Sequence, residues 1–461
     1  MTDTIAAPVT DAPGASAPPP FARHTLPNGL TVLTREMHTA PVVSFWIWYR
    51  VGARNEHLGI TGVSHWVEHM LFKGTPTFPA GSIHTVIAEN GGTLNGFTSD
   101  DFTTYFETLP SDRWELALQI EADRIANASF KPEEVASERT VIISEREGHE
   151  NDPDFKLNEE VQSAAFKLHP YGVDTIGWKC DLLSMTRADL YNHYRTYYAP
   201  NNAIIVAVGD FETPYLLQRV TEMFGGLQPS ADIPEVTAVE PPQEGERRVV
   251  VRRPGPTASL QIAYHAPAAN DADVYPMMIA DALLSGAKAM GMGGGAALGR
   301  SARLYRALVQ TDLAAGVGSY FRLTRDPHLF QIAGTAKPGK PWEDSLRAME
   351  DAIYRELDKL AAEPPSAQEL EKAIRQSRAQ FVYSGESVTG LGFIFGYLEV
   401  VASADFYTRF LDGLAAVKPE DVQRVVRTYL NANNRTVGWF VPQEDEAATT
   451  VEAPAEAAPA V

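Results

Sequence analysis

The sequence predicts an α+β protein built from two homologous domains. Strand-like apolar runs alternate with stretches of helical periodicity along the whole chain. A group of residues near the middle recurs near the end at a constant offset of 232 positions, which marks a duplicated unit of about 230 residues. The pairs are Asp189 and Asp421, Arg195-Thr196-Tyr197 and Arg427-Thr428-Tyr429, and Asn201-Asn202 and Asn433-Asn434.

The composition along the chain sets the expected domain boundaries. A stretch rich in proline and glutamate separates the two copies and is typical of a linker. Both ends of the chain are rich in alanine, proline and acidic residues, so we expect disordered tails there. The predicted segments are a tail at 1–21, a first domain at 22–233, a linker at 234–246, a second domain at 247–442 and an acidic tail at 443–461.

The elements of the first domain can be predicted in order. Pro27-Asn28-Gly29 forms a turn between two strand-like pieces, and residues 42–51 form a buried strand. Gly91-Gly92 ends a helix over 82–89, and an extended segment follows within 94–109. The remaining elements are an amphipathic helix at 114–126, a helix that starts at Pro132, helical pieces within 155–198 and a short buried strand at 203–208.

The stretch His65-Trp66-Val67-Glu68-His69 suits a helix that is apolar on one side. On a helix the two histidines are one turn apart, so both rings project from the same face. Two imidazoles placed in this way can hold one zinc ion, and Glu68 beside them can take a proton from the attacking water. The alternative is an ordinary polar helix face.

A catalytic zinc ion needs a third protein ligand. Glu138 and Glu145 are two helical turns apart, so both carboxylates share one face of the helix that starts at Pro132. Glu147 and Glu150 are alternative third ligands on the same stretch.

These residues and their spacing resemble the pitrilysin family of zinc peptidases, which includes insulin-degrading enzyme and the mitochondrial processing peptidase. The matching features are His-x-x-Glu-His, a glutamate 76 residues after His69, a glutamate one heptad before it, and a segment like Gly-Gly-x-x-Asn-Ala-x-Thr at 91–98. The resemblance covers about residues 22–442. It implies two α+β domains, each a mixed β-sheet flanked by helices, which face each other across a cavity.

The resemblance also implies roles for individual residues. His65, His69 and Glu145 would hold one zinc ion, Glu68 would be the catalytic base, and Glu138 would orient a ligand. Co²⁺ or Mn²⁺ would suit the same ligand set.

The same family places the substrate on an edge strand, here Asn95, Gly96, Phe97 and Thr98. A peptide would bind there by strand addition. Gly96 departs from the family pattern, which usually has alanine at this position.

A second departure concerns the second domain. The family usually carries an arginine and a tyrosine seven residues apart there, which bind the substrate and the oxyanion. In this chain Val309 or Leu308 replaces the arginine and Ala315 replaces the tyrosine. We therefore predict that the chain is the zinc-bearing subunit of a heterodimer whose related partner supplies the Arg/Tyr pair, with a homodimer as the alternative assembly.

Nearby residues leave two further alternatives open. Arg303, Tyr305 and Arg306 could replace the missing pair by a different geometry. Just upstream, the glycine-rich segment 286–299 resembles in position the loop that gates substrate entry in the processing peptidase, or it is a flexible surface insert.

The predicted function is a zinc-dependent endopeptidase that hydrolyses oligopeptides or unfolded segments in an enclosed chamber. The alternatives are a presequence-processing subunit and a non-catalytic scaffold of the same family. The net charge of −20 argues against nucleic acid as a partner. The sequence has no run of about 18 apolar residues, so no membrane span is predicted, and we recognise no targeting signal. We therefore expect a cytoplasmic protein.

The single cysteine, Cys180, is expected to be a buried and inert thiol.

Overall fold

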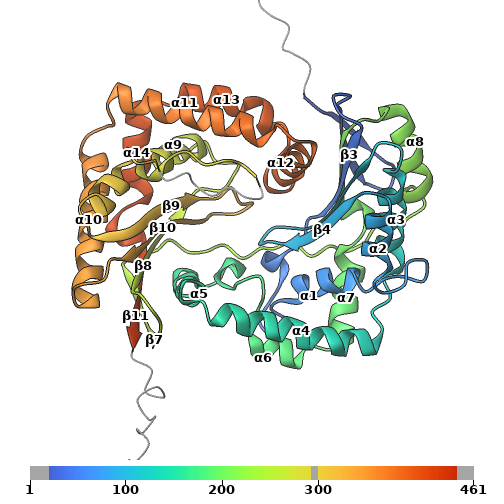
Figure 1. The fold of residues 1–461 in the computed structure, drawn as a ribbon, viewed down its shortest axis with the longest axis horizontal. Coiled ribbons are helices and arrows are strands. Elements are labelled where there is room, and N and C mark those ends of the chain that lie inside the picture. The colour runs from blue at the N-terminus through green and yellow to red at the C-terminus, as the bar shows by residue number, and fades with distance from the viewer. Residues whose placement is uncertain (1–19, 292–298, 444–461) are drawn as a thin grey trace, which may run out of the picture.

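The computed structural model describes residues 20–291 and 299–443 of the chain (Figure 1). The tails predicted to be disordered, 1–21 and 443–461, therefore lie almost wholly outside the described residues. Part of the glycine-rich segment 286–299 also lies outside them. Two sheets flanked by helices make up the described part, one in each half of the chain, and this confirms the predicted α+β class.

The first sheet has six strands in the order β1-β2-β6-β3-β5-β4. β2 and β6 run parallel and all other neighbours run antiparallel, so the sheet is mixed. The predicted extended segment at 94–109 is a hairpin of two strands, and β4 forms the edge of the sheet. The strands are β1 (Ala22–Thr25), β2 (Thr31–Glu36), β3 (Val42–Tyr49), β4 (Thr93–Thr98), β5 (Thr103–Pro110) and β6 (Ala203–Gly209).

The second sheet repeats this topology without a counterpart of β1. Its order is β7-β11-β8-β10-β9, with a parallel pair at β7 and β11 and antiparallel neighbours elsewhere. β9 lies at the edge of this sheet, as β4 does in the first. The strands are β7 (Arg247–Pro254), β8 (Ser259–Ala266), β9 (Ala314–Phe321), β10 (His328–Ala336) and β11 (Arg435–Gln443).

The helices follow the same duplicated plan. Those of the first half are α1 (Val63–Leu71), α2 (Ser82–Glu89), α3 (Glu115–Asn127), α4 (Pro132–Glu150), α5 (Pro153–Ala165), α6 (Lys179–Ser184), α7 (Arg187–Tyr197) and α8 (Thr213–Phe224). Those of the second half are α9 (Val274–Ser285), α10 (Trp342–Ala362), α11 (Ala367–Ser384), α12 (Val388–Val401), α13 (Phe406–Ala416) and α14 (Pro419–Tyr429). The short helical turns are η1 (Ala53–Asn55), η2 (Pro170–Gly172), η3 (Pro200–Asn202), η4 (Tyr305–Val309) and η5 (Ala432–Asn434).

The repeat seen in the sequence has a structural cause. α7, η3 and β6 correspond to α14, η5 and β11, and their starting residues differ by the same 232 positions. The Asn202 side chain donates a hydrogen bond to the Tyr197 carbonyl oxygen at 2.9 Å, and the Asn434 side chain does the same to the Tyr429 carbonyl oxygen at 2.7 Å. In each half the amide therefore ties the end of a helix to the start of the central strand that follows.

Each sheet is covered on one face by a helix from the other half. On the first sheet, odd-numbered residues of β3 such as Phe45 and Ile47 pack under helices of the first half, whereas Trp46 and Trp48 face α12. On the second sheet, α5 packs on β7, β8 and β11. The halves therefore exchange equivalent helices, since α5 follows α4 in chain order as α12 follows α11.

Glycines allow the exchanged helices to approach closely. A Cβ atom added at Gly392 would lie 2.3 Å from the Trp46 indole nitrogen, and one at Gly396 would lie 2.1 Å from the Trp48 indole. On the second sheet, a Cβ atom at Gly438 would lie 2.2 Å from a methyl of Val161. All three contacts need a glycine at the point where a helix meets a sheet.

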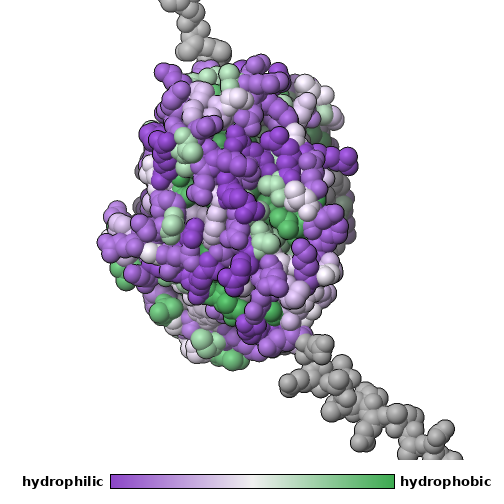
Figure 2. Space-filling model, turned by 90° about the vertical axis from the view of Figure 1, so that its left-hand side faces the viewer, coloured by the Kyte–Doolittle hydropathy of each residue, from purple (hydrophilic) through white to green (hydrophobic). Residues whose placement is uncertain are grey.

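The outer face of the second half is mainly hydrophilic, with small separated hydrophobic patches (Figure 2). Such scattered apolar residues are normal on a protein surface. Among the described residues no single helix is long and apolar enough to cross a membrane, and α12 and α13 meet that length and composition only as a pair bent by 83°.

The expectation of a buried Cys180 is wrong. This thiol is exposed on the short surface helix α6. The helix buries Asp181 and Leu182 in its place.

Candidate metal centre

The centre lies where α1 meets α4. α1 begins after Gly62, which has a left-handed φ of 85°, and a Cβ atom there would lie 2.5 Å from the Ile176 carbonyl oxygen. The buried Glu56 carboxylate accepts hydrogen bonds from the backbone N–H groups of Gly62 at 2.7 Å and Ser64 at 2.8 Å. Burial raises the pKa of Glu56 to about 8, and these hydrogen bonds oppose that rise. Glu56 therefore fixes the start of the helix that carries both histidines, a role that the sequence did not reveal.

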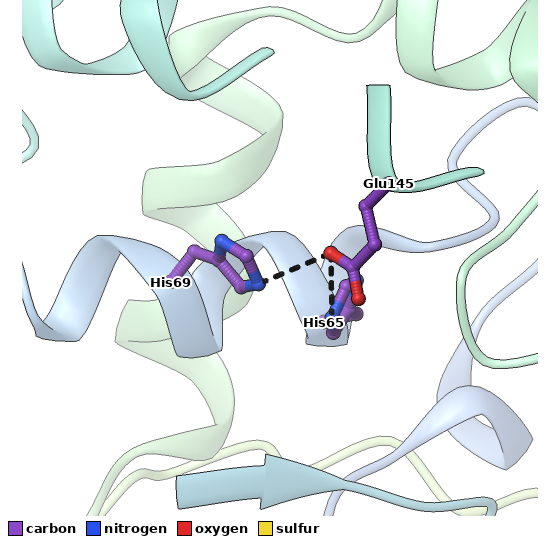
Figure 3. Close-up of side chains that lie close together, drawn as sticks. All are labelled: His65, His69 and Glu145. Atoms are coloured by element: carbon purple, nitrogen blue, oxygen red, sulfur yellow. Dashed lines mark ion pairs between the residues drawn. The ribbon is translucent and has the colours of Figure 1, made fainter. Parts of the chain in front are cut away.

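The structure brings His65, His69 and Glu145 together (Figure 3). Their ligand atoms all lie within 4.8 Å of one another. The Nε2 atoms of His65 and His69 lie 3.8 Å and 3.7 Å from the same oxygen of Glu145. Both rings therefore direct the same nitrogen to the point at which the carboxylate arrives from α4.

A supporting chain of polar contacts orients His69. Its Nδ1 atom lies 2.8 Å from a carboxylate oxygen of Glu138, and Lys73 pairs with the other oxygen of Glu138. Burial alone would raise the pKa of Glu138, but the hydrogen bonds with His69 and Lys73 and the charge of Lys73 outweigh it and lower that pKa. An ionised Glu138 accepts a hydrogen bond from the Nδ1–H of His69, so Nε2 carries the lone pair and turns it toward the centre.

The two histidines differ in their surroundings. Burial and the neighbouring ring of His69 lower the pKa of His65 to about 3. Burial also disfavours a charged His69, but the hydrogen bond with Glu138 and the nearby carboxylates raise the pKa of His69 above its ordinary value. The Nδ1 atom of His65 is buried and has no hydrogen-bond partner among the described residues.

Glu68 lies on the same helix and is only 7% exposed. The Thr98 hydroxyl, at the end of the edge strand β4, donates a hydrogen bond to a Glu68 oxygen at 2.7 Å. Burial raises the pKa of Glu68 to about 7, and the hydrogen bond from Thr98 opposes this rise. Glu68 thus links the helix of the centre to the strand predicted to hold substrate.

The donor set fits a zinc ion. Imidazole nitrogen and carboxylate oxygen are both common zinc ligands, and atoms about 2.0–2.1 Å from a tetrahedral ion lie about 3.3 Å apart. The distances of 3.7 Å and 3.8 Å found here are wider by only a few tenths of an ångström. Three protein ligands would leave a fourth position open, as in catalytic zinc sites.

The alternative third ligands lie elsewhere. Glu147 pairs with Lys179 at 2.6 Å, and Glu150 pairs with Arg146 at 3.1 Å. Neither belongs to the group of ligand atoms that gathers at the centre.

The structure explains why β4 has a glycine at position 96. A Cβ atom there would lie 2.8 Å from the Tyr105 ring and 3.0 Å from the Phe72 ring. Glycine therefore makes room for two aromatic neighbours where the family usually has alanine.

The residues proposed to replace the Arg/Tyr pair lie in the second half. Arg303 pairs with Glu369 at 3.0 Å, and Arg306 lies 4.0 Å from the same carboxylate. Both line a cavity formed by α9 and α11 residues, and no residue of the metal centre lines it. Leu308 is buried in η4, and Ala315 is exposed near the start of β9.

Comparison with known proteins identifies the family of the chain. The model of the "Insulinase (Peptidase family M16)" domain matches residues 31–178, and the model of the "Peptidase M16 inactive domain" matches residues 184–377. The chain belongs to the M16 family of peptidases, the pitrilysin family. The resemblance drawn from the sequence is therefore confirmed.

Individual M16 relatives cover nearly the whole chain. A protein of Helicobacter pylori named zinc protease PqqE is 28% identical over 91% of this chain and 92% of its own length. A probable mitochondrial-processing peptidase subunit beta of Arabidopsis thaliana is 26% identical over 91% of this chain and 78% of its own length.

Solved structures of other proteins show the same fold. A crystal structure of a protease from Helicobacter pylori has a TM-score of 0.85 at 27% identity and covers 92% of this chain and 99% of that chain. The structure of a peptidase M16 inactive domain from Pseudomonas fluorescens has a TM-score of 0.80 at 18% identity and covers 92% of this chain and 98% of that chain.

Proposed function

We propose that the chain is a zinc-dependent endopeptidase that hydrolyses oligopeptides or unfolded segments of polypeptides. The observation that carries this proposal is the convergence of His65, His69 and Glu145 beside the buried carboxylate Glu68. Relatives named zinc proteases support the choice of metal.

In this proposal His65, His69 and Glu145 hold one zinc ion. Zinc bound there would act as a Lewis acid that polarises the scissile carbonyl and lowers the pKa of water. Glu68 takes the proton of the attacking water and then delivers it to the leaving amine. Glu138 and Lys73 hold the His69 ring in the orientation that the ion requires.

The substrate would bind along β4. This strand is the edge of the first sheet, and it pairs only with β5 among the described strands. The Gly96 N–H donates at 2.9 Å to the side chain of Asn95, its own neighbour, instead of to a second strand. A carbonyl of an incoming peptide could replace that side chain, so main-chain hydrogen bonds would supply affinity with little dependence on sequence.

We further propose that the active assembly is a heterodimer. Leu308, Val309 and Ala315 cannot supply the guanidinium and phenol that family members present to the substrate. Loss of one oxyanion donor typically lowers kcat by about 10²–10³-fold, so the chain alone would be a weak enzyme. A related subunit that carries the Arg/Tyr pair would complete the site.

Removal of presequences is a second candidate activity. Its support is the similarity to a protein named as a mitochondrial-processing peptidase subunit. A presequence peptide offered beside an unrelated peptide of equal length would separate the two candidates, because only a processing subunit would prefer the presequence.

The test of the proposed function uses a quenched fluorescent peptide and the zinc-loaded chain, with Glu68→Gln as the control. We expect weak hydrolysis that disappears in the Glu68→Gln variant while the zinc content stays unchanged. A chain that binds no zinc, or hydrolysis that survives the substitution, would reject the mechanism. Strong hydrolysis by the chain alone would reject the heterodimer.

A further inference from the structure

A cavity of about 470 Å³ opens beside β4 on the face that is turned away from α1. Asn95 and Phe97 of the first half line one side of it, and Thr98 borders it although its hydroxyl is turned toward Glu68 on the α1 side. Most of the remainder is lined by residues of α9, α11, α12, α13, the end of β9 and the segment that follows α9. The cavity therefore lies between the two halves and includes the strand proposed to hold the substrate.

The walls of this cavity are mainly apolar and rich in aromatic rings. Phe393 lies 6.1 Å from Phe97 and 5.6 Å from Tyr397, measured between ring centroids. The aromatic lining residues are Phe97, Phe102, Tyr320, Phe321, Phe381, Phe393, Tyr397 and Phe410. Such rings favour an apolar occupant, and above all an aromatic one that can stack or meet them edge to face.

The charged groups in the wall already have partners. Lys288 pairs with Asp281 at 2.7 Å, and Arg322 pairs with Asp100. Asp281 also accepts a hydrogen bond from Ser319 at 2.5 Å. A charged ligand side chain would have to break one of these pairs, so the cavity does not suit one.

The geometry of β4 connects the cavity to the substrate. Gly96 and Thr98 face the α1 side, as their contacts with Phe72 and Glu68 show. Phe97 lies on the opposite face and packs on the core that contains α12. A peptide strand added to β4 would follow the same alternation, because successive side chains of a strand point to opposite faces.

We infer that this cavity is a side-chain subsite of the bound peptide, and that it selects a large apolar residue, aromatic above all. The inference rests on the proposed binding of a peptide strand along β4. The selected residue is the one that lies beside Phe97 and whose side chain points away from the metal centre. Its two neighbours in the peptide face the α1 side, so the preference should be lost when the large residue is moved by one position.

Peptide binding to the full-length Glu68→Gln chain tests this inference without need of cleavage. The probes are fluorescein-labelled peptides of nine residues. Each carries one phenylalanine, placed at a different position in each peptide, and serine at all remaining positions. Fluorescence anisotropy gives the Kd of each peptide. We expect phenylalanine to tighten binding by about tenfold or more at one position, and to have little effect at the adjacent positions.

A cavity-filling variant supplies the matched control. Ala289 lines the cavity on the segment after α9, and Ala289→Trp should remove the preference for phenylalanine while it leaves the Kd of the all-serine peptide within about twofold. Met290→Trp fills the same cavity from the next residue and guards against a folding defect of the first variant. Ala367→Trp places the same side chain at an exposed position outside the cavity and should behave like the parent chain.

The outcomes separate this inference from the proposed function. Equal affinity for the serine and phenylalanine peptides, or an equal loss of both in Ala289→Trp, would overturn the subsite. A chain that bound none of the peptides would overturn it as well. A position-dependent preference for phenylalanine in a chain that never hydrolyses peptides would uphold the subsite and reject the peptidase activity.

Discussion

The two halves place a helix at the same point of the same topology and use it differently. α1 follows the central strand β3, and α9 follows the central strand β8. α1 carries two histidines and a glutamate, whereas α9 has neither residue type and buries all but two of its twelve residues. α9 is surrounded by β9, α11, α13 and α14, and a helix enclosed in this way is mainly apolar, with Asp281 as its one charged residue.

The difference shows which parts of the duplicated unit resist change. The contacts that join a helix to its sheet persist in both halves, as the hydrogen bonds of Asn202 and Asn434 show. The candidate metal ligands, by contrast, gather in one half only among the described residues. Scaffold contacts are needed wherever the fold is needed, whereas the proposed chemistry needs one metal centre.

The largest effects are expected from substitutions in the candidate metal centre, because its residues make the first half chemically different from the second. Glu145→Gln removes the charged third ligand, so we expect loss of zinc and hydrolysis near background. Glu68→Gln should keep the zinc and still lower kcat by about 10²–10⁴-fold, the usual contribution of a general acid or base. Zinc content by mass spectrometry, measured beside kcat, distinguishes the two variants.

The control for this prediction lies in the second half. Asp281 is a buried acid on α9, the helix that corresponds to α1. Asp281→Asn should leave the zinc content unchanged. If Asp281→Asn lowered the zinc content, the second half would also take part in binding metal.

A smaller effect is expected at the residue that orients His69. Glu138→Gln removes the negative charge from the hydrogen bond to Nδ1 of His69 and from the pair with Lys73. Zinc affinity should fall by about 10–100-fold, the usual cost of losing such a partner. Competition with a chelator of known affinity measures it. An unchanged zinc affinity would show that Glu138 has no role in holding the ligand.

The exchanged helices give a prediction on stability. Gly396→Ala would press a Cβ atom into the Trp48 indole, and Gly438→Ala would press one into Val161. Each should lower the free energy of unfolding by about 1–3 kcal/mol, the usual cost of an overpacked core. Unfolding in urea measures it, and comparable losses at both sites would show that the two exchanges are equally important.

Gly148→Ala is the control for a helical glycine with open space around it. Nothing lies within 4 Å of a Cβ atom at this position in α4. Alanine should stabilise the chain there by about 0.5–1 kcal/mol, because it is the better helix former. A loss of stability at Gly148 equal to that at Gly396 would mean that the cost is not steric.

Local patterns predicted much of the fold and of the candidate site. The helix at 82–89 and the strands at 42–51 and 203–208 follow from periodicity and turn residues, and the structure confirms them closely. The spacing within α1 and α4 also brought three ligand candidates to one place. In these cases the information lies within one element or in the spacing of two.

The parts that the sequence did not reveal depend on contacts between distant residues. The exchange of α5 and α12 leaves no local signal, because an apolar helix looks the same whichever sheet it covers. Glu56 lies seven positions before the first residue of α1 and reaches its N-terminus only through the path of the intervening loop. Cys180 is exposed although cysteine is usually buried, and nothing in the neighbouring residues indicates which side of α6 faces solvent.

The smallest expected effects concern the shared scaffold. Asn434→Ala removes two hydrogen bonds from the amide to backbone carbonyls, at 2.8 Å and 2.7 Å, whereas Asn202→Ala removes one at 2.9 Å and a long contact at 3.5 Å. In each half these contacts join the end of a helix to a neighbouring strand. The expected loss in the free energy of unfolding is about 0.5–1.5 kcal/mol for each hydrogen bond of good geometry. Asn202 is only 5% exposed, so its unpaired carbonyl partners would be cut off from water and its substitution should cost more than that of the half-buried Asn434. Urea unfolding of the two variants measures the difference. A larger loss for Asn434→Ala would show that the second half depends on this contact more than the first, although the candidate metal centre lies in the first half.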